Sequence, residues 1–113
     1  MIAHLKQSPV TLNDALRKSV AAAIGEVCAY RNWSLEAINV RTNHVHVVVG
    51  ASSPPERVLT QFKSYATRRA RAQGLVASKG RLWTRHGSTR YLWTERDVEA
   101  AMAYTIEAQG SPL

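Results

Sequence analysis

The chain has 113 residues, of which 45% are hydrophobic and 20% are charged, and these values fit one globular domain with a modest core. No stretch approaches the roughly 20 consecutive apolar residues of a membrane span, and the first residues lack the apolar core of a signal peptide. Membrane-spanning and disordered proteins are therefore excluded, and we expect a single cytoplasmic domain over residues 1–113.

The charge of the chain indicates a class of partner. Fifteen Lys and Arg residues stand against eight Asp and Glu residues, which gives a formal net charge of +7. An excess of this size on a small domain attracts polyanions, and nucleic acid is the commonest of these. A basic protein that is merely kept in solution by its charge is the alternative.

A helix and a hairpin are predicted in the first half of the chain. Apolar residues at helical spacing indicate a helix over residues 12–31, with Asn13 as its N-cap. Alternating apolar residues predict strands over residues 34–40 and 44–50. Because only a short turn separates these two strands, we expect them to form a hairpin.

The segment after the hairpin predicts a long basic helix. Ser53 and Glu56 have the spacing of a capping box, and two prolines stand in the first turn, so the helix begins here. It runs to about residue 73 and stops at Gly74, a residue typical of helix ends. The inner stripe of this helix consists of Leu59, Phe62, Ala66 and Ala70.

The last third of the chain predicts two short strands and a helix. Residues 81–85 and 88–93 form extended segments on either side of a turn at His86-Gly87. Thr94 then caps a helix that ends at about Gly110. The inner face of this helix consists of Val98, Met102 and Ile106.

This order of elements predicts the α+β class, with an antiparallel sheet and helices packed on one face. The arrangement resembles a ferredoxin-like fold without its opening strand. Residues 1–6 are the only segment that could supply that strand, and their sequence is a weak strand pattern. We therefore expect the opening strand to be short or missing.

Two histidines stand in the second strand of the hairpin, in the stretch NHVHVVV at residues 43–49. Alternate side chains of a strand share a face, so His44 and His46 project together about 6–7 Å apart along the strand. Neutral imidazole is a favoured ligand of divalent metals, so the pair supplies two thirds of a facial metal site. Two half-buried histidines bonded to the backbone or to water are the alternative.

Two clusters of basic and aromatic residues suit a nucleic acid. One lies on the helix over residues 53–73, and the other lies at residues 83–93. Basic side chains can contact a phosphate backbone, and aromatic rings can stack on bases. The alternative for the charged helix is that its basic side chains are simply solvated. The residues predicted to bind nucleic acid are Lys63, Tyr65, Arg68, Arg69, Arg71, Arg85 and Arg90.

Taken in order, these motifs resemble the single-tyrosine HUH transposases, the class of insertion-sequence and REP-associated enzymes. NHVHVVV is similar to the histidine motif of that family, and QFKSYATRRARAQG is similar to its basic helix. LWTRHGSTRYLW is similar to the tryptophan-containing segment that follows. DVEAAMAYTIEAQG is similar to the tyrosine helix and puts Tyr104 in the position of the nucleophile. The resemblance covers roughly residues 10–110.

The resemblance implies a metal-dependent endonuclease and strand transferase that acts on single-stranded or hairpin DNA. Tyr104 would attack a phosphodiester, leaving a 5′-phosphotyrosine link and a free 3′-OH. In model compounds a phenol ionises only at about pH 10, so a tyrosine needs help to react at neutral pH. Mg²⁺ or Mn²⁺ held by His44 and His46 would assist the attack. A homodimer is one possible assembly, and neither a membrane nor a small-molecule substrate is expected.

The third metal ligand is less well indicated by the sequence. The family supplies a polar residue one turn beyond the tyrosine, where this chain has Ala108, which cannot bind metal. At about 100° per residue, Gln109 lies roughly 140° round the helix from Tyr104, and Glu107 about 60° round. Gln109 matches the family's residue type and is the predicted ligand, with Glu107 as its rival, and both could simply be solvated.

Alternatives also exist for the nucleophile and for the activity. Tyr65 follows the histidine strand and stands among arginines, but the position of Tyr104 in the last helix favours Tyr104. A tyrosine at either place could instead be a packing residue. The same fold without working chemistry would be a DNA-hairpin-binding module, and a small metal-binding regulator is a weaker third interpretation.

Overall fold

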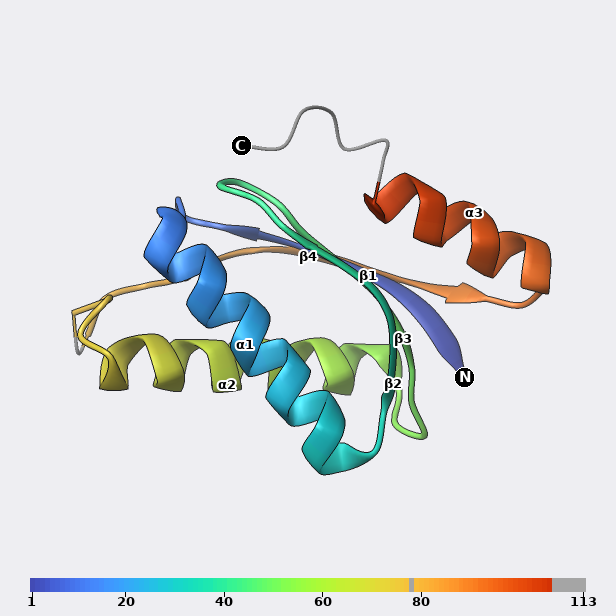
Figure 1. Cartoon of the computed structure of the whole chain (residues 1–113), viewed down its shortest axis with the longest axis horizontal. Coiled ribbons are helices and arrows are strands. Elements are labelled where there is room, and N and C mark those ends of the chain that lie inside the picture. The colour runs from blue at the N-terminus through green and yellow to red at the C-terminus, as the bar shows by residue number, and fades with distance from the viewer. Residues whose placement is uncertain (78, 107–113) are drawn as a thin grey trace.

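Seven elements are present in the structure, a computed structural model that describes residues 1–77 and 79–106, without the side chain of His86. They form an α+β arrangement, as predicted (Figure 1). None of the helices within the described residues is long and apolar enough to cross a membrane. The elements in chain order are β1 (Ile2–Pro9), α1 (Asp14–Arg31), β2 (Ser34–Val40), β3 (Val45–Gly50), α2 (Pro55–Ala72), β4 (Trp83–Leu92) and α3 (Glu95–Ile106).

The expectation of a short or missing opening strand was wrong. β1 has eight residues and lies inside the sheet, whose order is β2-β3-β1-β4, with antiparallel pairing on both sides of β1. Ala3 and Leu5 are buried in the main core, whereas His4 and Lys6 face the other side. The strand pattern was weak because its second face carries polar residues, and pairing with two neighbours stabilises the strand nevertheless.

The helices lie on both faces of the sheet, so the prediction that they pack on one face was wrong for α3. Figure 1 shows α1 and α2 on one side of the sheet and α3 on the other. Val47 and Val49 of β3 join the main core with α1 and α2, whereas Val48 packs in a smaller cluster with Leu92 and Ala101. β3 is therefore buried on both faces, which explains its nearly continuous run of valines.

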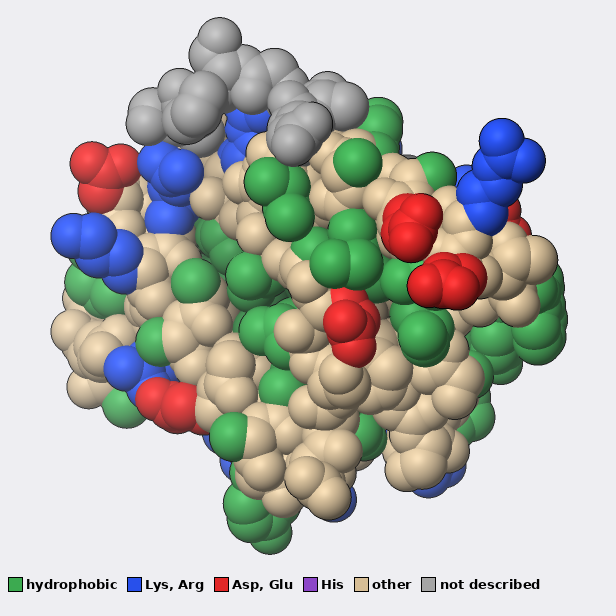
Figure 2. Space-filling view, turned by 45° about the vertical axis from the view of Figure 1, so that its right-hand side comes forward, with side chains coloured by type: hydrophobic (Ala, Val, Ile, Leu, Met, Phe, Trp, Pro, Cys, Tyr) green, Lys and Arg blue, Asp and Glu red, His purple; other side chains and the backbone are tan. Residues whose placement is uncertain are grey.

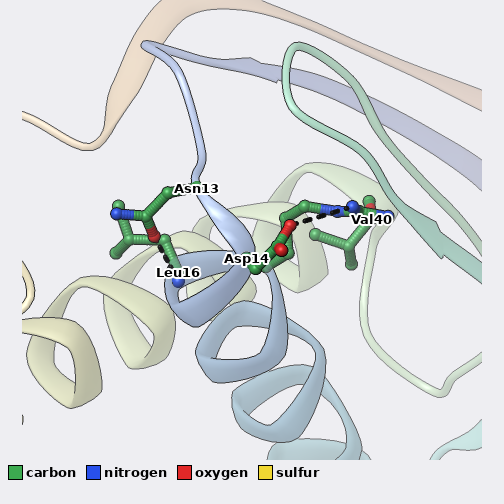
Figure 3. A network of polar contacts seen from close by, with 5 residues as sticks. Asn13, Asp14, Leu16 and Val40 are labelled. Atoms are coloured by element: carbon green, nitrogen blue, oxygen red, sulfur yellow. Dashed lines mark hydrogen bonds and ion pairs between the residues drawn. The ribbon is translucent and has the colours of Figure 1, made fainter. Parts of the chain in front are cut away.

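The first turn of α1 is fixed to the end of β2, as Figure 3 shows. Asn13 caps the helix as predicted, since its side-chain oxygen accepts a hydrogen bond of 2.9 Å from the Leu16 N–H. Arg17 pairs with Asp14 at 3.5 Å and donates from Nε to the Val40 carbonyl at 3.0 Å. These bonds hold the hairpin end of β2, next to the turn that leads to His44.

The two other predicted caps have different outcomes. The N-cap of α2 is Pro54, without a side-chain hydrogen bond, so the predicted capping box of Ser53 and Glu56 was wrong. Proline at that position already holds the extended backbone that a cap requires. At α3 the prediction is confirmed, because the Thr94 hydroxyl accepts a hydrogen bond of 3.0 Å from the Asp97 N–H.

β4 is one strand of ten residues rather than two short strands around a turn. Gly87 lies opposite Gln7 in the pairing with β1, and a Cβ at this position would stand 2.2 Å from Gln7 Oε1. The glycine thus leaves room for the side chain of Gln7, and sequence reasoning mistook it for a turn. Of the two tryptophans in this segment, Trp83 packs against the main core, whereas Trp93 is 80% exposed.

The predicted inner face of α3 was correct in part. Val98 and Met102 pack against the smaller cluster, but the buried residues of the helix are Ala101 and Thr105. Ile106 is 59% exposed, so its assignment to the inner face was wrong. The stripe that faces the sheet passes through Thr105, and Ile106 is turned about 100° away from it on the helix.

Candidate active site

Two strands and one helix bring two imidazoles and a phenol together on the α3 side of the sheet. His4 comes from β1, His46 from β3 and Tyr104 from α3. The ring centroids lie 5.4 Å apart for His4 and His46, 5.8 Å for His46 and Tyr104, and 6.1 Å for His4 and Tyr104. Residues separated by 42 or more positions in sequence thus form one cluster of three rings.

His44 extends this cluster towards the hairpin turn. It lies just before β3, where the Arg41 N–H donates a hydrogen bond of 2.8 Å to its carbonyl. Its ring stacks on the His46 ring, with centroids 6.0 Å apart and an interplanar angle of 18°. A contact of 2.9 Å joins His44 Nδ1 to the Asn43 side-chain oxygen. The two predicted histidines therefore share a face, and His46 lies between His44 and Tyr104.

The valines of β3 fix the positions of these histidines. Val45, Val47 and Val49 point into the main core, so the alternation of a strand turns His46 to the opposite face. There His46 is only 2% exposed. The apolar run that makes the stretch look like a buried strand is thus what anchors the imidazole.

The surroundings of the cluster are positively charged. Burial, together with the smaller effects of the nearby imidazoles, Lys6 and Arg41, lowers the pKa of His46 to about 4. Burial also lowers the pKa of His4, followed by the charges of Arg90 and Lys6. Both imidazoles are therefore neutral at pH 7, which is the form that binds metals. The cationic neighbours favour a negatively charged group, such as a phosphate, at this position.

Asn39 connects the last turn of α3 to the histidine strand. It lies directly opposite His46 in the pairing of β2 and β3, and its side-chain amide donates a hydrogen bond of 2.9 Å to the Thr105 carbonyl. Thr105 is fully buried and follows Tyr104 in the chain. This bond ties the turn that carries Tyr104 to the strand that lies beside His46.

Sequence reasoning missed both His4 and Asn39. His4 was overlooked because the strand that carries it was not predicted, although its alternation with buried Ala3 and Leu5 was a usable signal. Asn39 has the appearance of any polar residue in a half-exposed strand. Its role depends on a helix that arrives from the far end of the chain, and no local pattern reports that.

The described residues supply part of a metal site. Within residues 1–77 and 79–106, no three side chains of the His, Cys, Asp and Glu types are placed to hold a metal ion. The predicted third ligand Gln109 and its rival Glu107 lie outside the described residues. His44 and His46 fit the chemistry of a divalent ion as two neighbouring imidazoles, one of them held neutral by burial.

The predicted basic helix lies on the other face of the sheet. Lys63, Arg68 and Arg71 line a hollow beside Trp83. Because α2 packs against the main core, this hollow is separated from the histidine cluster by the sheet. Arg69 is engaged in an ion pair with Glu26 of α1.

Tyr65 belongs to the same face of the sheet as this hollow. It packs against the main core, and the Arg68 guanidinium lies over its ring, 4.8 Å from the centroid. The rival nucleophile is therefore on the far side of the sheet from His44 and His46. The structure brings Tyr104, and not Tyr65, to the histidines.

β4 carries the remaining nucleic-acid candidates. Arg90 lies opposite His4 in the pairing of β1 and β4, so it shares the histidine face, whereas Arg85 is exposed nearer the start of the strand. At the far end, the exposed rings of Tyr91 and Trp93 stack with centroids 5.1 Å apart. Of the residues predicted to bind nucleic acid, Arg90 is thus the one that lies beside the cluster of His4, His46 and Tyr104.

The outer surface of α3 has more acidic than basic residues, with Arg96 as its one arginine. Figure 2 turns this side of the molecule forward and shows acidic side chains gathered on it, and those on the helix are Glu95, Asp97 and Glu99. A polyanion is repelled by such a surface and attracted by the basic residues beside the imidazoles. The approach of a nucleic acid from the side of Lys6 and Arg90 is therefore favoured.

Comparisons with known proteins bear on this arrangement. The sequence matches the family described as "Transposase IS200 like" over residues 1–104. A solved protein of Deinococcus radiodurans R1, provisionally identified as a transposase, is 18% identical with a TM-score of 0.69, over 96% of this chain and 90% of its own. A REP-associated tyrosine transposase bound to a REP hairpin is 14% identical with a TM-score of 0.69, over 92% of this chain and 63% of its own. These likenesses confirm the predicted fold class. None of the curated proteins matches the sequence.

Proposed function

The chain belongs to the IS200-like transposase family, and from this membership we propose that it cleaves and rejoins single-stranded DNA in a metal-dependent reaction. The observation that carries the proposal is the position of Tyr104, whose ring lies 5.8 Å from the ring of His46 and 6.1 Å from that of His4. A phenol among neutral imidazoles and cationic side chains is a suitable nucleophile for a phosphodiester.

Tyr104 is the proposed nucleophile. Its oxygen forms a bond to phosphorus while the bond from phosphorus to the 3′ oxygen breaks, and the phenol proton and the departing 3′ oxygen yield a free 3′-OH. The product is a 5′-phosphotyrosine link. Because this link is itself a phosphodiester, another 3′-OH can attack it and release the tyrosine, so strand transfer needs no nucleotide cofactor.

The chain's own residues bind and orient the phosphate. Lys6 lies opposite His46 in the sheet, and Arg90 lies opposite His4, so both cations flank the imidazoles. His44 and His46 would hold Mg²⁺ or Mn²⁺, together with a third ligand for which Gln109 and Glu107 stay the candidates. Such an ion supplies a Lewis acid that polarises the scissile phosphate and stabilises the leaving oxygen.

The proposed substrate is DNA that contains a hairpin. One solved neighbour is bound to a REP hairpin, and the net charge of +7 in this chain suits a polyanionic partner of that kind. The nucleophile and the histidines are supplied by the same chain, since α3 packs on its own sheet. We therefore expect one chain to complete the site even if the protein forms a homodimer.

A covalent-adduct assay tests the proposal. The protein is incubated with labelled single-stranded oligonucleotides that contain hairpins, with and without Mn²⁺, and protein–DNA adducts are separated on denaturing gels. We expect an adduct that needs Mn²⁺, disappears in Tyr104→Phe and persists in Tyr65→Phe, which is the matched control on the opposite face. An adduct that survives Tyr104→Phe would show that the nucleophile is wrong.

A hairpin-binding module without catalysis is the second candidate. It is favoured by one observation in the sequence, namely that Ala108, which cannot bind metal, stands where the family supplies its third ligand. This module would bind hairpin DNA in a salt-sensitive way, would form no adduct on any oligonucleotide, and would bind DNA equally well with and without Mn²⁺.

A further inference from the structure

His4 makes a direct contact with the proposed metal ligand His46, although it lies outside the His-Val-His motif. The atoms His4 Nε2 and His46 Nδ1 are 3.2 Å apart, which is a hydrogen-bonding distance. The two rings are tilted by 42°, and they belong to adjacent strands in the middle of the sheet. Both strands are held by the main core, so the contact joins two rigidly placed side chains.

Two neutral imidazoles can share this hydrogen bond in two ways. In the first, His46 donates from Nδ1–H to Nε2 of His4, and its own Nε2 keeps a free lone pair. In the second, His4 donates from Nε2–H to Nδ1 of His46, which must then carry its proton on Nε2. Only the first arrangement leaves His46 with a nitrogen that can bind a metal ion.

We propose that His4 is a positioning residue that accepts a hydrogen bond from His46 Nδ1–H and so directs the Nε2 lone pair of His46 to a divalent cation. This inference rests on the proposed function, in which His46 is a metal ligand. Metal-binding histidines usually donate their second ring N–H to a carboxylate, a carbonyl or water. In this site a histidine from the neighbouring strand takes that part.

The neighbouring histidine shows the same device. Nδ1 of His44 lies 2.9 Å from the Asn43 side-chain oxygen, which accepts a hydrogen bond and so places the proton of that ring on Nδ1. Both stacked imidazoles then carry Nδ1–H and keep Nε2 unprotonated. Because two different partners set the two tautomers, His4 controls His46 alone, and His44 serves as an internal reference.

Two variants of His4 test the proposal. His4→Gln places an amide oxygen at about the reach of Nε2 and can still accept from His46 Nδ1–H, whereas His4→Phe keeps a ring without an acceptor. In ¹⁵N-histidine-labelled, metal-free protein at pH 7, long-range ¹H–¹⁵N spectra identify the protonated nitrogen of each ring. We expect Nδ1–H on His46 in the wild type and in His4→Gln, and a shift towards Nε2–H in His4→Phe.

The affinity for Mn²⁺, measured by titration of the metal alone, is the second readout. Loss of an outer hydrogen-bond partner usually weakens metal binding about 10- to 100-fold, and we expect this loss in His4→Phe but not in His4→Gln. The tautomer of His44 should be unchanged in both variants, which reports that the hairpin is intact. Thermal unfolding of both variants separates this effect from a general loss of stability.

Two results would overturn the inference. One is a wild-type His46 that carries its proton on Nε2, and the other is unchanged Mn²⁺ affinity in a folded His4→Phe variant. Failure of the proposed function gives a different result, in which no variant forms a DNA adduct while tautomer and Mn²⁺ affinity still depend on His4. That pattern would leave His4 as a positioning residue for a metal site without nuclease activity.

Discussion

The amide of Asn39 is predicted to hold Tyr104 beside His46. Its hydrogen bond of 2.9 Å ends on the main-chain carbonyl of Thr105, in the last turn of α3, and Asn39 lies directly opposite His46. Asn39→Ala removes the donor and leaves that carbonyl without this partner. Because Thr105 is fully buried, water replaces the lost donor poorly while the helix stays docked.

The size of the effect follows from the site. A neutral hydrogen bond contributes about 0.5–1.5 kcal/mol net, and an unpaired buried acceptor costs about 1–3 kcal/mol. We therefore expect Asn39→Ala to cost about 1–2 kcal/mol. α3 is otherwise docked through a small apolar cluster around Val48, Leu92 and Ala101, so the loss should appear mainly as local opening of α3.

Hydrogen–deuterium exchange measures this opening. A change of about 1–2 kcal/mol corresponds to amides of α3 that exchange about 5- to 30-fold faster, with those of β3 unchanged. Thr105→Val is the matched control, because the Thr105 hydroxyl has no hydrogen-bond partner within the described residues and the carbonyl is retained. Exchange in Asn39→Ala at the wild-type rate, or equal acceleration in Thr105→Val, would refute the reasoning.

Three further predictions concern the stability of the scaffold, measured as the free energy of unfolding in urea. Asn13→Ala should lower it by about 1 kcal/mol through loss of the cap, whereas Ser53→Ala, where no side-chain cap exists, should leave it nearly unchanged; equal losses would contradict the assigned caps. Gly87→Ala should cost about 1–3 kcal/mol, because the new Cβ must displace the buried side chain of Gln7, and a neutral result would show that this side chain moves aside easily. His46 has a pKa of about 4 in the folded protein and an ordinary value of 6.5, so between these values the unfolded state binds more protons than the folded state. The free energy of unfolding should therefore fall as the pH drops from 6.5 to 4, by up to about 3 kcal/mol. His46→Gln should flatten that pH dependence, and an equally steep profile in the variant would assign it to other groups.

The parts of the fold that the sequence predicted are those with local signals. Asn13, Thr94 and the alternation around His46 each depend on a few neighbouring residues, and each was correctly interpreted. The nucleophile candidate Tyr104 was reached by resemblance, and its position beside His46 agrees with that expectation without testing its role.

The parts that the sequence did not predict depend on pairing between distant segments. β1 looks polar because one of its faces is only partly covered, and its strand character comes from β3 and β4 on either side. Gly87 looked like part of a turn because the reason for a glycine there, the space taken by the side chain of Gln7, lies 80 residues earlier in the chain. α3 likewise packs on the side of the sheet where Val48 contacts the smaller cluster, and in the sequence Val48 looks like any other valine of a buried strand.

The two faces of the sheet differ in how firmly they hold the candidate site. α1 and α2 cover the larger core, which anchors β1 and β3 and therefore fixes His4 and His46. α3 is docked by the smaller cluster and by the amide of Asn39, so Tyr104 is the member of the site whose position depends on a weak contact. Detachment of α3 would remove the phenol and leave the imidazoles in place. A substitution at Asn39 should accordingly slow adduct formation without weakening Mn²⁺ binding. A substitution at His4 that removes its acceptor should instead weaken Mn²⁺ binding.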